Sequence, residues 1–221
     1  MLSRRLDEVR KKIEAAATRS GRDARDITLL AVTKKFPAAV ISEAYQLGVR
    51  DFGENYVQEF EGKHAELSGL PDARFHLIGH LQSNKTKRAA ELFHVIQTVD
   101  SAKLARRLDA EGKRLDVMLE VKLSPEESKA GADQEGLDAL VTAVRACHNL
   151  NLAGLMTMPP WTDEAEPSRP YFSRLRQLAQ RYSLPQLSMG MSHDFEVAIE
   201  EGSTCVRIGT ALFGPRPRAS A

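Results

Sequence analysis

A lysine stands at the end of the first strongly apolar segment of the chain. The run LLAVTKKFP (29–37) places Lys34 and Lys35 directly after apolar positions and just before Pro37. A lysine amine held close to a low-dielectric core loses proton affinity, because desolvation disfavours the ammonium form. A neutral amine can condense with an aldehyde to form a Schiff base. Lys34 is therefore a candidate for this chemistry, and the alternative is a solvated pair of lysines at a strand end.

The last two apolar segments end in sequences suited to binding an anion. SMGMS (188–192) leads into HDFEVAIEEG (193–202), where we expect Ser192 to cap a helix. VRIGTALFG (206–214) places Gly209 and Thr210 just after the final strand. Bare backbone N–H groups and a helix N-terminus are what a phosphate group requires. Simple turn chemistry is the alternative for the glycines, and no Lys-Ser/Thr pair completes a Walker motif.

Arg207 lies inside the otherwise apolar run CVRIG (205–209). A charged side chain in a buried strand is costly unless it is paired or functional. The arginine is either one half of an ion pair inside the fold or a partner for a ligand's pyridine nitrogen. Pyridoxal 5'-phosphate (PLP) needs an aldehyde-trapping lysine, a phosphate site and a partner for its ring nitrogen. Lys34, the glycine-rich ends and Arg207 together would meet those needs.

These residues follow apolar segments that alternate with amphipathic ones. We expect strands at 27–33, 50–54, 74–79, 94–100, 115–123, 150–158, 185–192 and 204–214. Continuous apolar runs are typical of parallel strands covered on both faces, and eight of them in alternation with helices predict a (β/α)8 barrel of the TIM type. Such a barrel collects the ends of its strands at one mouth. A doubly wound open sheet is the alternative, but the first turn, KKFPAAV, lacks the G-x-G-x-x-G fingerprint.

The expected barrel spans about residues 27–214 of a single domain, 1–221, and an amphipathic helix over about 2–19 precedes it. The acidic residues of that helix argue against a transit peptide, and no apolar run is long enough to span a membrane. We therefore expect a cytoplasmic protein. Cys147 and Cys205 lie in no CxxC motif, and His76 and His80 flank a glycine, so neither a disulfide framework nor a metal site is expected.

The charge balance favours a small-molecule ligand. The 221 residues include 31 Lys+Arg and 30 Asp+Glu, giving a net charge of +1, and 42% are hydrophobic. This composition is that of a globular protein and excludes disordered and collagen-like classes. The basic run SNKTKR (83–88) could bind an anion or nucleic acid, but a solvated helix face is the expected reading. We expect no nucleic-acid partner and no membrane association.

Several motifs resemble those of the pyridoxal phosphate homeostasis (YggS/PROSC) family. They are GENYVQE (53–59), HLIGHLQSNK (76–85), GLMTM (154–158), SMGMSHDFEVAIEEGST (188–204) and VRIGTALFG (206–214), in family order over about residues 6–214. The resemblance implies a PLP-binding barrel similar to the N-terminal domain of alanine racemase, without established catalysis. It implies a role in PLP (vitamin B6) homeostasis, with PLP-dependent apoenzymes as recipients of the cofactor.

The resemblance also assigns roles to individual residues. It implies that Lys34 holds PLP as an internal aldimine, that Arg207 lies near the pyridine nitrogen and that Asn55 lines the pocket. Ser192, Gly209 and Thr210 would bind the phosphate. The family often reads AVSK followed by a T-K-P-like run, whereas AVTKKFP stands here, and motif position selects Lys34 over Lys35. His193 replaces an acidic residue, which should alter the rim of the site more than its grip on the cofactor.

The same residues bear on whether the protein is an enzyme. An arginine opposite the ring nitrogen disfavours its protonation, which weakens PLP as an electron sink. Racemisation on this fold also needs a second acid/base, which the resembling racemases take from a C-terminal domain. Only PRPRASA follows Gly214. We therefore expect a monomeric cofactor carrier with no catalytic residues, and a PLP-dependent racemase-like enzyme acting on an amino acid is the alternative.

Overall fold

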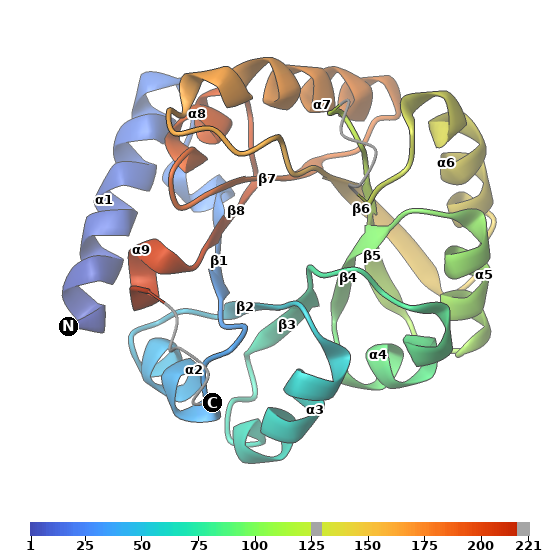
Figure 1. The fold of residues 1–221 in the computed structure, drawn as a ribbon, viewed down its shortest axis with the longest axis horizontal. Coiled ribbons are helices and arrows are strands. Elements are labelled where there is room, and N and C mark those ends of the chain that lie inside the picture. The colour runs from blue at the N-terminus through green and yellow to red at the C-terminus, as the bar shows by residue number, and fades with distance from the viewer. Residues whose placement is uncertain (125–129, 216–221) are drawn as a thin grey trace.

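Eight parallel strands close into a barrel in the computed structural model, which describes residues 1–124 and 130–215 (Figure 1). Each strand pairs with the next, and β8 pairs with β1 to complete the ring. The strands are β1 (Thr28–Val32), β2 (Asp51–Glu54), β3 (Arg74–Leu77), β4 (Val95–Val99), β5 (Leu115–Glu120), β6 (Leu150–Met156), β7 (Gln186–Met191) and β8 (Cys205–Ile208). The barrel prediction is confirmed, and closure excludes the open sheet.

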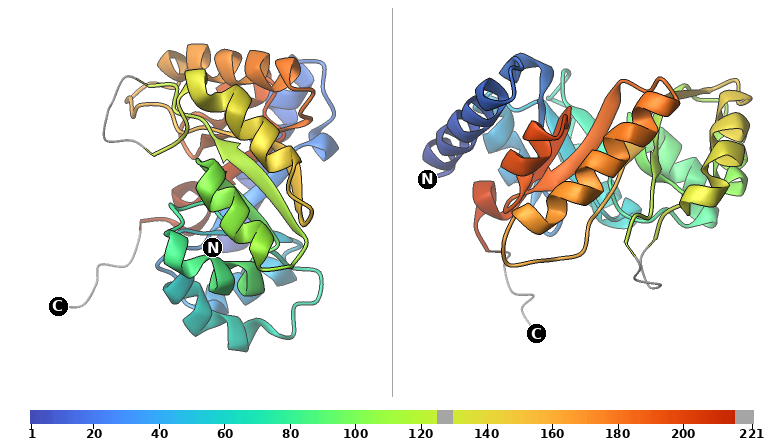
Figure 2. Two further views of the ribbon diagram at one scale, coloured as in Figure 1. Left: turned by 90° about the vertical axis from the view of Figure 1, so that its right-hand side faces the viewer. Right: turned by 90° about the horizontal axis from the view of Figure 1, so that it is seen from above.

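Helices cover the outer face of the barrel (Figures 1 and 2). Those between strands are α2 (Ala38–Gln46), α3 (Val57–His64), α4 (Thr86–Leu92), α5 (Ala102–Ala110), α6 (Leu137–Arg145), α7 (Arg169–Arg181) and α8 (Phe195–Glu200). A short helix, α9 (Thr210–Phe213), follows the last strand, and α1 (Leu2–Arg19) precedes the first. The helix α1 buries Leu2, Leu6, Val9 and Ile13 at helical spacing and packs against α8 and α9.

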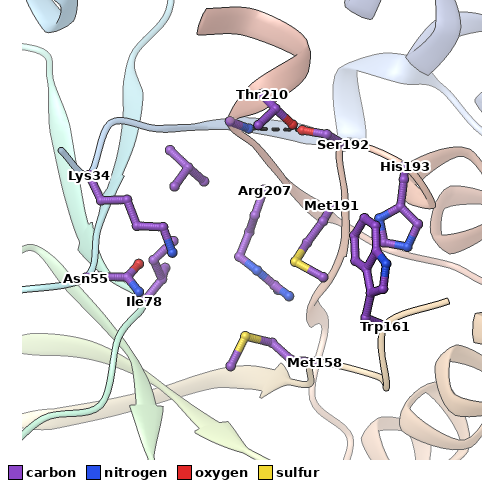
Figure 3. A pocket seen from close by; sticks show the side chains of 12 residues that line it. Lys34, Asn55, Ile78, Met158, Trp161, Met191, Ser192, His193, Arg207 and Thr210 are labelled. Carbon is purple, nitrogen blue, oxygen red and sulfur yellow. Dashed lines mark hydrogen bonds between the residues drawn. The ribbon is translucent and has the colours of Figure 1, made fainter. Parts of the chain in front are cut away.

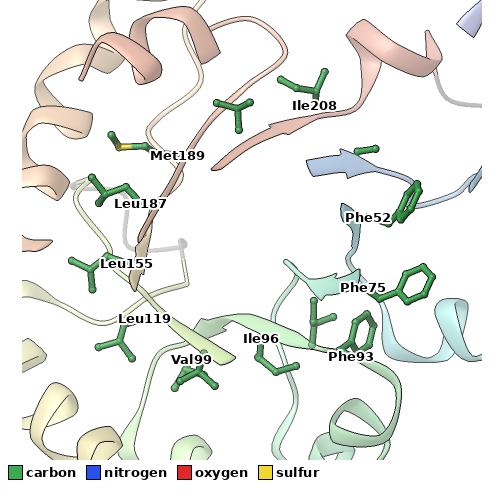
Figure 4. Close-up of a cluster of buried hydrophobic side chains, with 14 of the residues drawn as sticks. Phe52, Phe75, Phe93, Ile96, Val99, Leu119, Leu155, Leu187, Met189 and Ile208 are labelled. Atoms are coloured by element: carbon green, nitrogen blue, oxygen red, sulfur yellow. The ribbon is translucent and has the colours of Figure 1, made fainter. Parts of the chain in front are cut away.

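The main hydrophobic core lies between the strands and the surrounding helices. Leu155, Leu187 and Ile208 are among the buried side chains that occupy this shell (Figure 4). Because side chains alternate along a strand, β1 directs Ala31 to the shell and Leu30 and Val32 to the interior. The two inward residues form a separate small cluster with Ile78 and Cys205. The interior of the barrel is thus only partly apolar, which leaves room for polar side chains.

Two predictions about the last βα units are wrong: where the last strand ends, and which residue caps the helix after β7. The predicted last strand, 204–214, ends at Ile208, and the rest of that run turns into α9. Ser192 does not cap the helix that follows it. That helix, α8, begins at Phe195 with Asp194 at its N-cap, and the Asp194 carboxylate accepts the Met191 N–H at 2.6 Å. Gly190, near the end of β7, has φ of +93°, and a Cβ there would lie 2.5 Å from that of Ala198, so glycine is what allows α8 to pack this close to the strand.

The basic run 83–88 lies on a short 3₁₀ turn (Ser83–Lys85) and α4. Lys85 Nζ donates to Gln58 Oε1 at 2.7 Å, and Arg88 pairs with Glu61 and Glu91 at 2.8 and 2.6 Å. These cations therefore contact partners on the same chain. Of the seven residues that follow Gly214, those at 216–221 lie outside the described residues.

Within residues 1–124 and 130–215, no helix combines the length and the apolar character needed to cross a membrane.

Candidate functional site

A cavity of about 270 Å³ opens at the C-terminal ends of the strands. All six residues singled out from the sequence line it: Lys34, Asn55, Ser192, Arg207, Gly209 and Thr210 (Figure 3). They come from the ends of β1, β2, β7 and β8, which neighbour one another around the ring only because β8 pairs with β1. The closed barrel therefore brings residues from opposite ends of the chain into one site.

The two lysines after β1 have different surroundings. Lys34 is half-buried and directs its side chain into the cavity, whereas Lys35 is exposed and does not line it (Figure 3). Lys35 adopts a left-handed backbone conformation, with φ of 66°, which is uncommon for a residue other than glycine. The turn separates the side chains of two consecutive lysines, and only the first faces the cavity.

A buried ionic cluster holds the backbone on both sides of Lys34. Lys63 Nζ from α3 donates to Glu54 Oε1 at 3.0 Å, to Glu59 Oε1 at 2.6 Å and to the Thr33 carbonyl at 3.2 Å. Thr33 Oγ1 also donates to Glu54 Oε1 at 2.8 Å, and the Lys35 N–H donates to Glu59 Oε1 at 2.5 Å. Burial raises the pKa of Glu54, and the ammonium of Lys63 opposes that rise. The cluster fixes the turn that carries Lys34.

Asn55 follows β2 and faces the same cavity. A Cβ on Gly79 would lie 2.2 Å from the Asn55 carbonyl oxygen, so only a glycine permits this close approach of the two strand ends. The side-chain oxygen Oδ1 of Asn55 is buried and accepts no hydrogen bond from the described part of the chain. An amide oxygen without a partner at a cavity wall is available to a donor on a ligand.

Backbone N–H groups converge at the start of α9. Ser192 Oγ accepts from the Gly209 N–H at 3.2 Å, the dashed line in Figure 3, and from the Ala211 N–H at 3.3 Å. A Cβ added to Gly209 would meet Val32 only at 3.5 Å, an ordinary contact distance, so the packing of the chain itself does not require glycine there. Gly209 lines the cavity without a side chain, so a ligand can approach the backbone and the Ser192 hydroxyl at the start of α9, an arrangement suited to a phosphate.

Arg207 on β8 is a buried cation with neutral partners. Its side chain is 4% exposed, and its Nη1 and Nη2 donate to Ser188 Oγ at 2.8 Å and to the Thr157 carbonyl at 2.9 Å. Burial lowers the pKa of Arg207, because the desolvated guanidinium is disfavoured. A guanidinium has five N–H donors, so these two bonds leave donors that a ligand acceptor in the cavity can use.

A second cavity adjoins the first and contains a buried acid. It has a volume of about 370 Å³ and shares Met158, Trp161 and Met191 with the first. Glu120, the last residue of β5, lines it and is 3% exposed. Burial raises the pKa of Glu120 to about 7, although the positive charge of Arg207 acts in the opposite direction.

This acid should make the stability of the protein depend on pH. The pKa of Glu120 is about 7 in the folded state against an ordinary value of 4.5, so its contribution to stability is complete below pH 4.5 and is lost as the pH rises to 7. We therefore expect Glu120→Gln to stabilise the protein at pH 8 by about 3 kcal/mol and to change little at pH 4.5. Urea unfolding at both pH values measures the free energy of unfolding of the wild type and the variant. An equal difference between the two proteins at pH 4.5 and pH 8 would contradict the prediction.

The sequence did not single out several residues of the site. Val32, Ile78, Met158 and Met191 line the cavity, and their only signal was their position at the ends of apolar segments. Trp161 comes from the polar loop after β6 and is 68% exposed. It packs against His193 with ring centroids 4.0 Å apart and ring planes tilted by 46°. The pair lies at the wall opposite Lys34 (Figure 3). His193 thus lines the cavity, at the rim where the sequence placed it.

The chain is similar to proteins of known name along nearly its full length. Residues 5–217 match the family described as alanine racemase, N-terminal domain. The pyridoxal phosphate homeostasis protein of Pseudomonas aeruginosa is 47% identical over 221 residues, which cover 97% of this chain and 96% of that protein. The protein of the same name from Escherichia coli K12 is 44% identical over 229 residues, covering 97% of each chain.

Solved structures show the same arrangement of strands and helices. PipY of Synechococcus elongatus, solved with PLP bound, superposes with a TM-score of 0.85 at 39% identity, covering 97% of this chain and 100% of PipY. Alanine racemase from Corynebacterium glutamicum gives a TM-score of 0.67 at 17% identity, covering 98% of this chain and 62% of the racemase, which shows a common fold alone. The chain belongs to the alanine racemase N-terminal domain family and, at this level of identity, to the pyridoxal phosphate homeostasis proteins.

Proposed function

We propose that this chain is a single PLP-binding barrel domain, 1–221, that holds the cofactor reversibly for storage or delivery in PLP (vitamin B6) homeostasis. The observation that carries the proposal is the convergence of Lys34, the N–H groups at the start of α9 and Arg207 on one cavity. In this proposal the protein is a cytoplasmic monomer, it has no catalytic residues, and PLP-dependent apoenzymes receive the cofactor from it. The PLP-bound structure of PipY supports the choice of ligand.

The residues present fit PLP chemically. When bound, PLP would supply an aldehyde that condenses reversibly with a lysine amine to a Schiff base, with release of one water molecule. Lys34 provides the amine. The Ser192 hydroxyl accepts from the Gly209 and Ala211 N–H groups and keeps its own hydrogen, so it can donate to the phosphate together with the Thr210 hydroxyl. The Oδ1 of Asn55, which accepts no hydrogen bond from residues 1–124 and 130–215, is available to a ligand donor.

The position of Arg207 supports a role in binding the cofactor over a role in PLP-dependent catalysis. Its guanidinium is buried and makes hydrogen bonds only to neutral groups among the described residues, so it remains a donor toward the cavity. A cationic donor at a pyridine nitrogen opposes protonation of that nitrogen, because two positive charges would then meet at close range. The unprotonated ring stabilises carbanions poorly. Arg207 therefore favours a carrier over an enzyme.

The phosphate site can be tested by comparing two ligands. We expect Ser192→Ala to weaken binding of PLP by about tenfold or more, since hydrogen bonds to a charged phosphate are among the stronger ones. Binding of pyridoxal, which lacks the phosphate, should stay unchanged. Absorbance titration of the wild-type and variant proteins with each ligand measures both affinities. An equal loss for PLP and pyridoxal would place the phosphate elsewhere.

A racemase-like activity on an amino acid is the second candidate, and His193 is the observation that favours it. Its ring lines the cavity on the wall opposite Lys34, and neither ring nitrogen makes a hydrogen bond within the described chain (Figure 3). Racemisation needs acid/base groups on two faces of the substrate. Exchange of the α-hydrogen of amino acids with deuterated solvent, faster than with free PLP and lost in His193→Gln, would establish this activity. If the protein exchanges the α-hydrogen no faster than free PLP does, the result contradicts the racemase-like activity and supports the carrier function.

A further inference from the structure

A chain of hydrogen bonds crosses the interior of the barrel beneath the cavity. Arg207 Nη1 donates to Ser188 Oγ at 2.8 Å, and the Ser188 hydroxyl donates to Gln97 Oε1 at 2.6 Å. The Gln97 amide nitrogen lies 3.0 Å from His76 Nδ1, and His76 Nε2 lies 3.0 Å from Asp51 Oδ1. Five side chains from five strands are thereby connected in series.

The series runs from one mouth of the barrel to the other. Arg207 lines the cavity at the C-terminal ends of the strands. Asp51, His76 and Gln97 line a separate cavity of about 280 Å³ at the N-terminal ends. Ser188 and Gln97 are fully buried between them, each with no exposed surface. A buried polar network is costly unless every member has its partners, so these residues constrain one another.

The amide of Gln97 sets the direction of the chain. Its nitrogen donates to His76 Nδ1 and contacts Cys205 Sγ at 4.0 Å, which leaves Oε1 facing Ser188. The Ser188 hydroxyl then uses its single hydrogen on Gln97, and its oxygen accepts from Arg207. The Thr157 carbonyl accepts from the other terminal nitrogen of Arg207 at 2.9 Å. Two acceptors at fixed places define the plane of the guanidinium, and one acceptor would leave it free to rotate.

We propose that Ser188 and Gln97 are positioning residues, which hold the Arg207 guanidinium so that its remaining N–H donors face the ring nitrogen of PLP. The inference rests on the proposed function, because it concerns the same cavity. Anchored by His76 and Asp51, the chain keeps the arginine from turning toward other acceptors. Neither Ser188 nor Gln97 lines the cavity itself, so their effect on the ligand passes through Arg207.

The test compares PLP with its N1-methylated analogue, whose ring nitrogen cannot accept a hydrogen bond. We expect the wild-type protein to prefer PLP by about tenfold or more, the weight of a charge-assisted hydrogen bond. Ser188→Ala and Gln97→Met should each bring that preference below about threefold, the first more strongly, because weakening the acceptor frees the guanidinium. Ser203→Ala is the matched control. Its hydroxyl is equally buried, but its oxygen lies 2.8 Å from the Met189 carbonyl oxygen, which accepts its single hydrogen, and 3.2 and 3.1 Å from those of Leu187 and Cys205.

Melting temperatures of the ligand-free proteins separate positioning from stability. Ser188→Ala and Ser203→Ala should lower the melting temperature alike, and only the first should change the ligand preference. An undiminished preference in Ser188→Ala and Gln97→Met, together with a lost preference in Arg207→Met, overturns the positioning role alone. A wild-type protein that binds PLP without preference overturns the contact with the ring nitrogen. Failure of the wild-type protein to bind PLP at all overturns the proposed function. If Ser188→Ala does not fold, the preference of Gln97→Met for PLP over the analogue tests the positioning role by itself.

Discussion

Lys34→Ala is expected to abolish covalent capture of PLP. Lys34 directs its side chain into the cavity, so its amine is the nucleophile for the aldehyde (Figure 3). Borohydride reduction of the wild-type protein with PLP, followed by peptide mapping, should place the cofactor on Lys34. In Lys34→Ala the labelled peptide and the absorbance band of the Schiff base should both disappear. The phosphate and ring contacts alone should leave only weaker, non-covalent binding.

Lys35→Ala is the matched control for this experiment. The two lysines are adjacent, but Lys35 is exposed, lies in a left-handed turn and does not line the cavity. Its main contact to the cluster beneath the turn is its backbone N–H, which alanine retains. We therefore expect the band and the labelled peptide to persist in Lys35→Ala. Equal loss in both variants, or labelling of Lys34→Ala at another residue, would refute the assignment of Lys34.

Lys63→Met is expected to destabilise the fold by about 3–5 kcal/mol, the range for removing one partner of a buried ion pair. Glu54 has no exposed surface and Lys63 is only 9% exposed. Methionine fills a similar volume but gives no hydrogen bonds, so Glu54 and Glu59 lose the ammonium that both contact. Urea denaturation at pH 7 measures the loss. A cost below about 1 kcal/mol would be that of an exposed pair and would contradict the buried cluster.

Lys12→Met provides the comparison on an exposed ion pair. Lys12 lies 3.6 Å from Glu196, and its side chain is 61% exposed, so its removal should cost at most about 1 kcal/mol.

The loss of stability in Lys63→Met should also grow with pH. The pKa of Glu54 is already raised in the folded protein, and without Lys63 it rises further. A raised carboxyl pKa gives stability that is present at low pH and lost as the pH increases, so the variant should be closest to the wild type near pH 4.5.

Local patterns in the sequence were enough to predict the barrel, and together with the family motifs they selected six residues that line one cavity. Apolar runs and the amphipathic segments between them identify strands and helices, because each pattern depends only on which faces of one element are buried. The run IGTALFG misled the strand prediction, since β8 ends at Ile208, Gly209 caps α9, and the apolar residues beyond it form that helix. An apolar run by itself does not distinguish a strand from a short buried helix.

The buried clusters were beyond the reach of any local pattern. Glu59 and Lys63 have the i,i+4 spacing of an ordinary surface pair on a helix, and nothing in that spacing shows that α3 turns both toward Glu54. Ser192 illustrates the same limit. Its place before a helix suggested a cap, whereas its hydroxyl contacts backbone N–H groups of a different helix, seventeen and nineteen positions further along the chain.

The sequence by itself therefore determined the element order, the barrel and the six residues at its mouth. Only the tertiary structure decided how those residues face one another. Closure of β8 on β1 brings Arg207 and Gly209 to the lysine at the far end of the chain. It also encloses the series from Ser188 to Asp51, in which each bond depends on the register of a different strand. Register and closure are set by packing around the whole ring, and no short stretch of sequence contains that information.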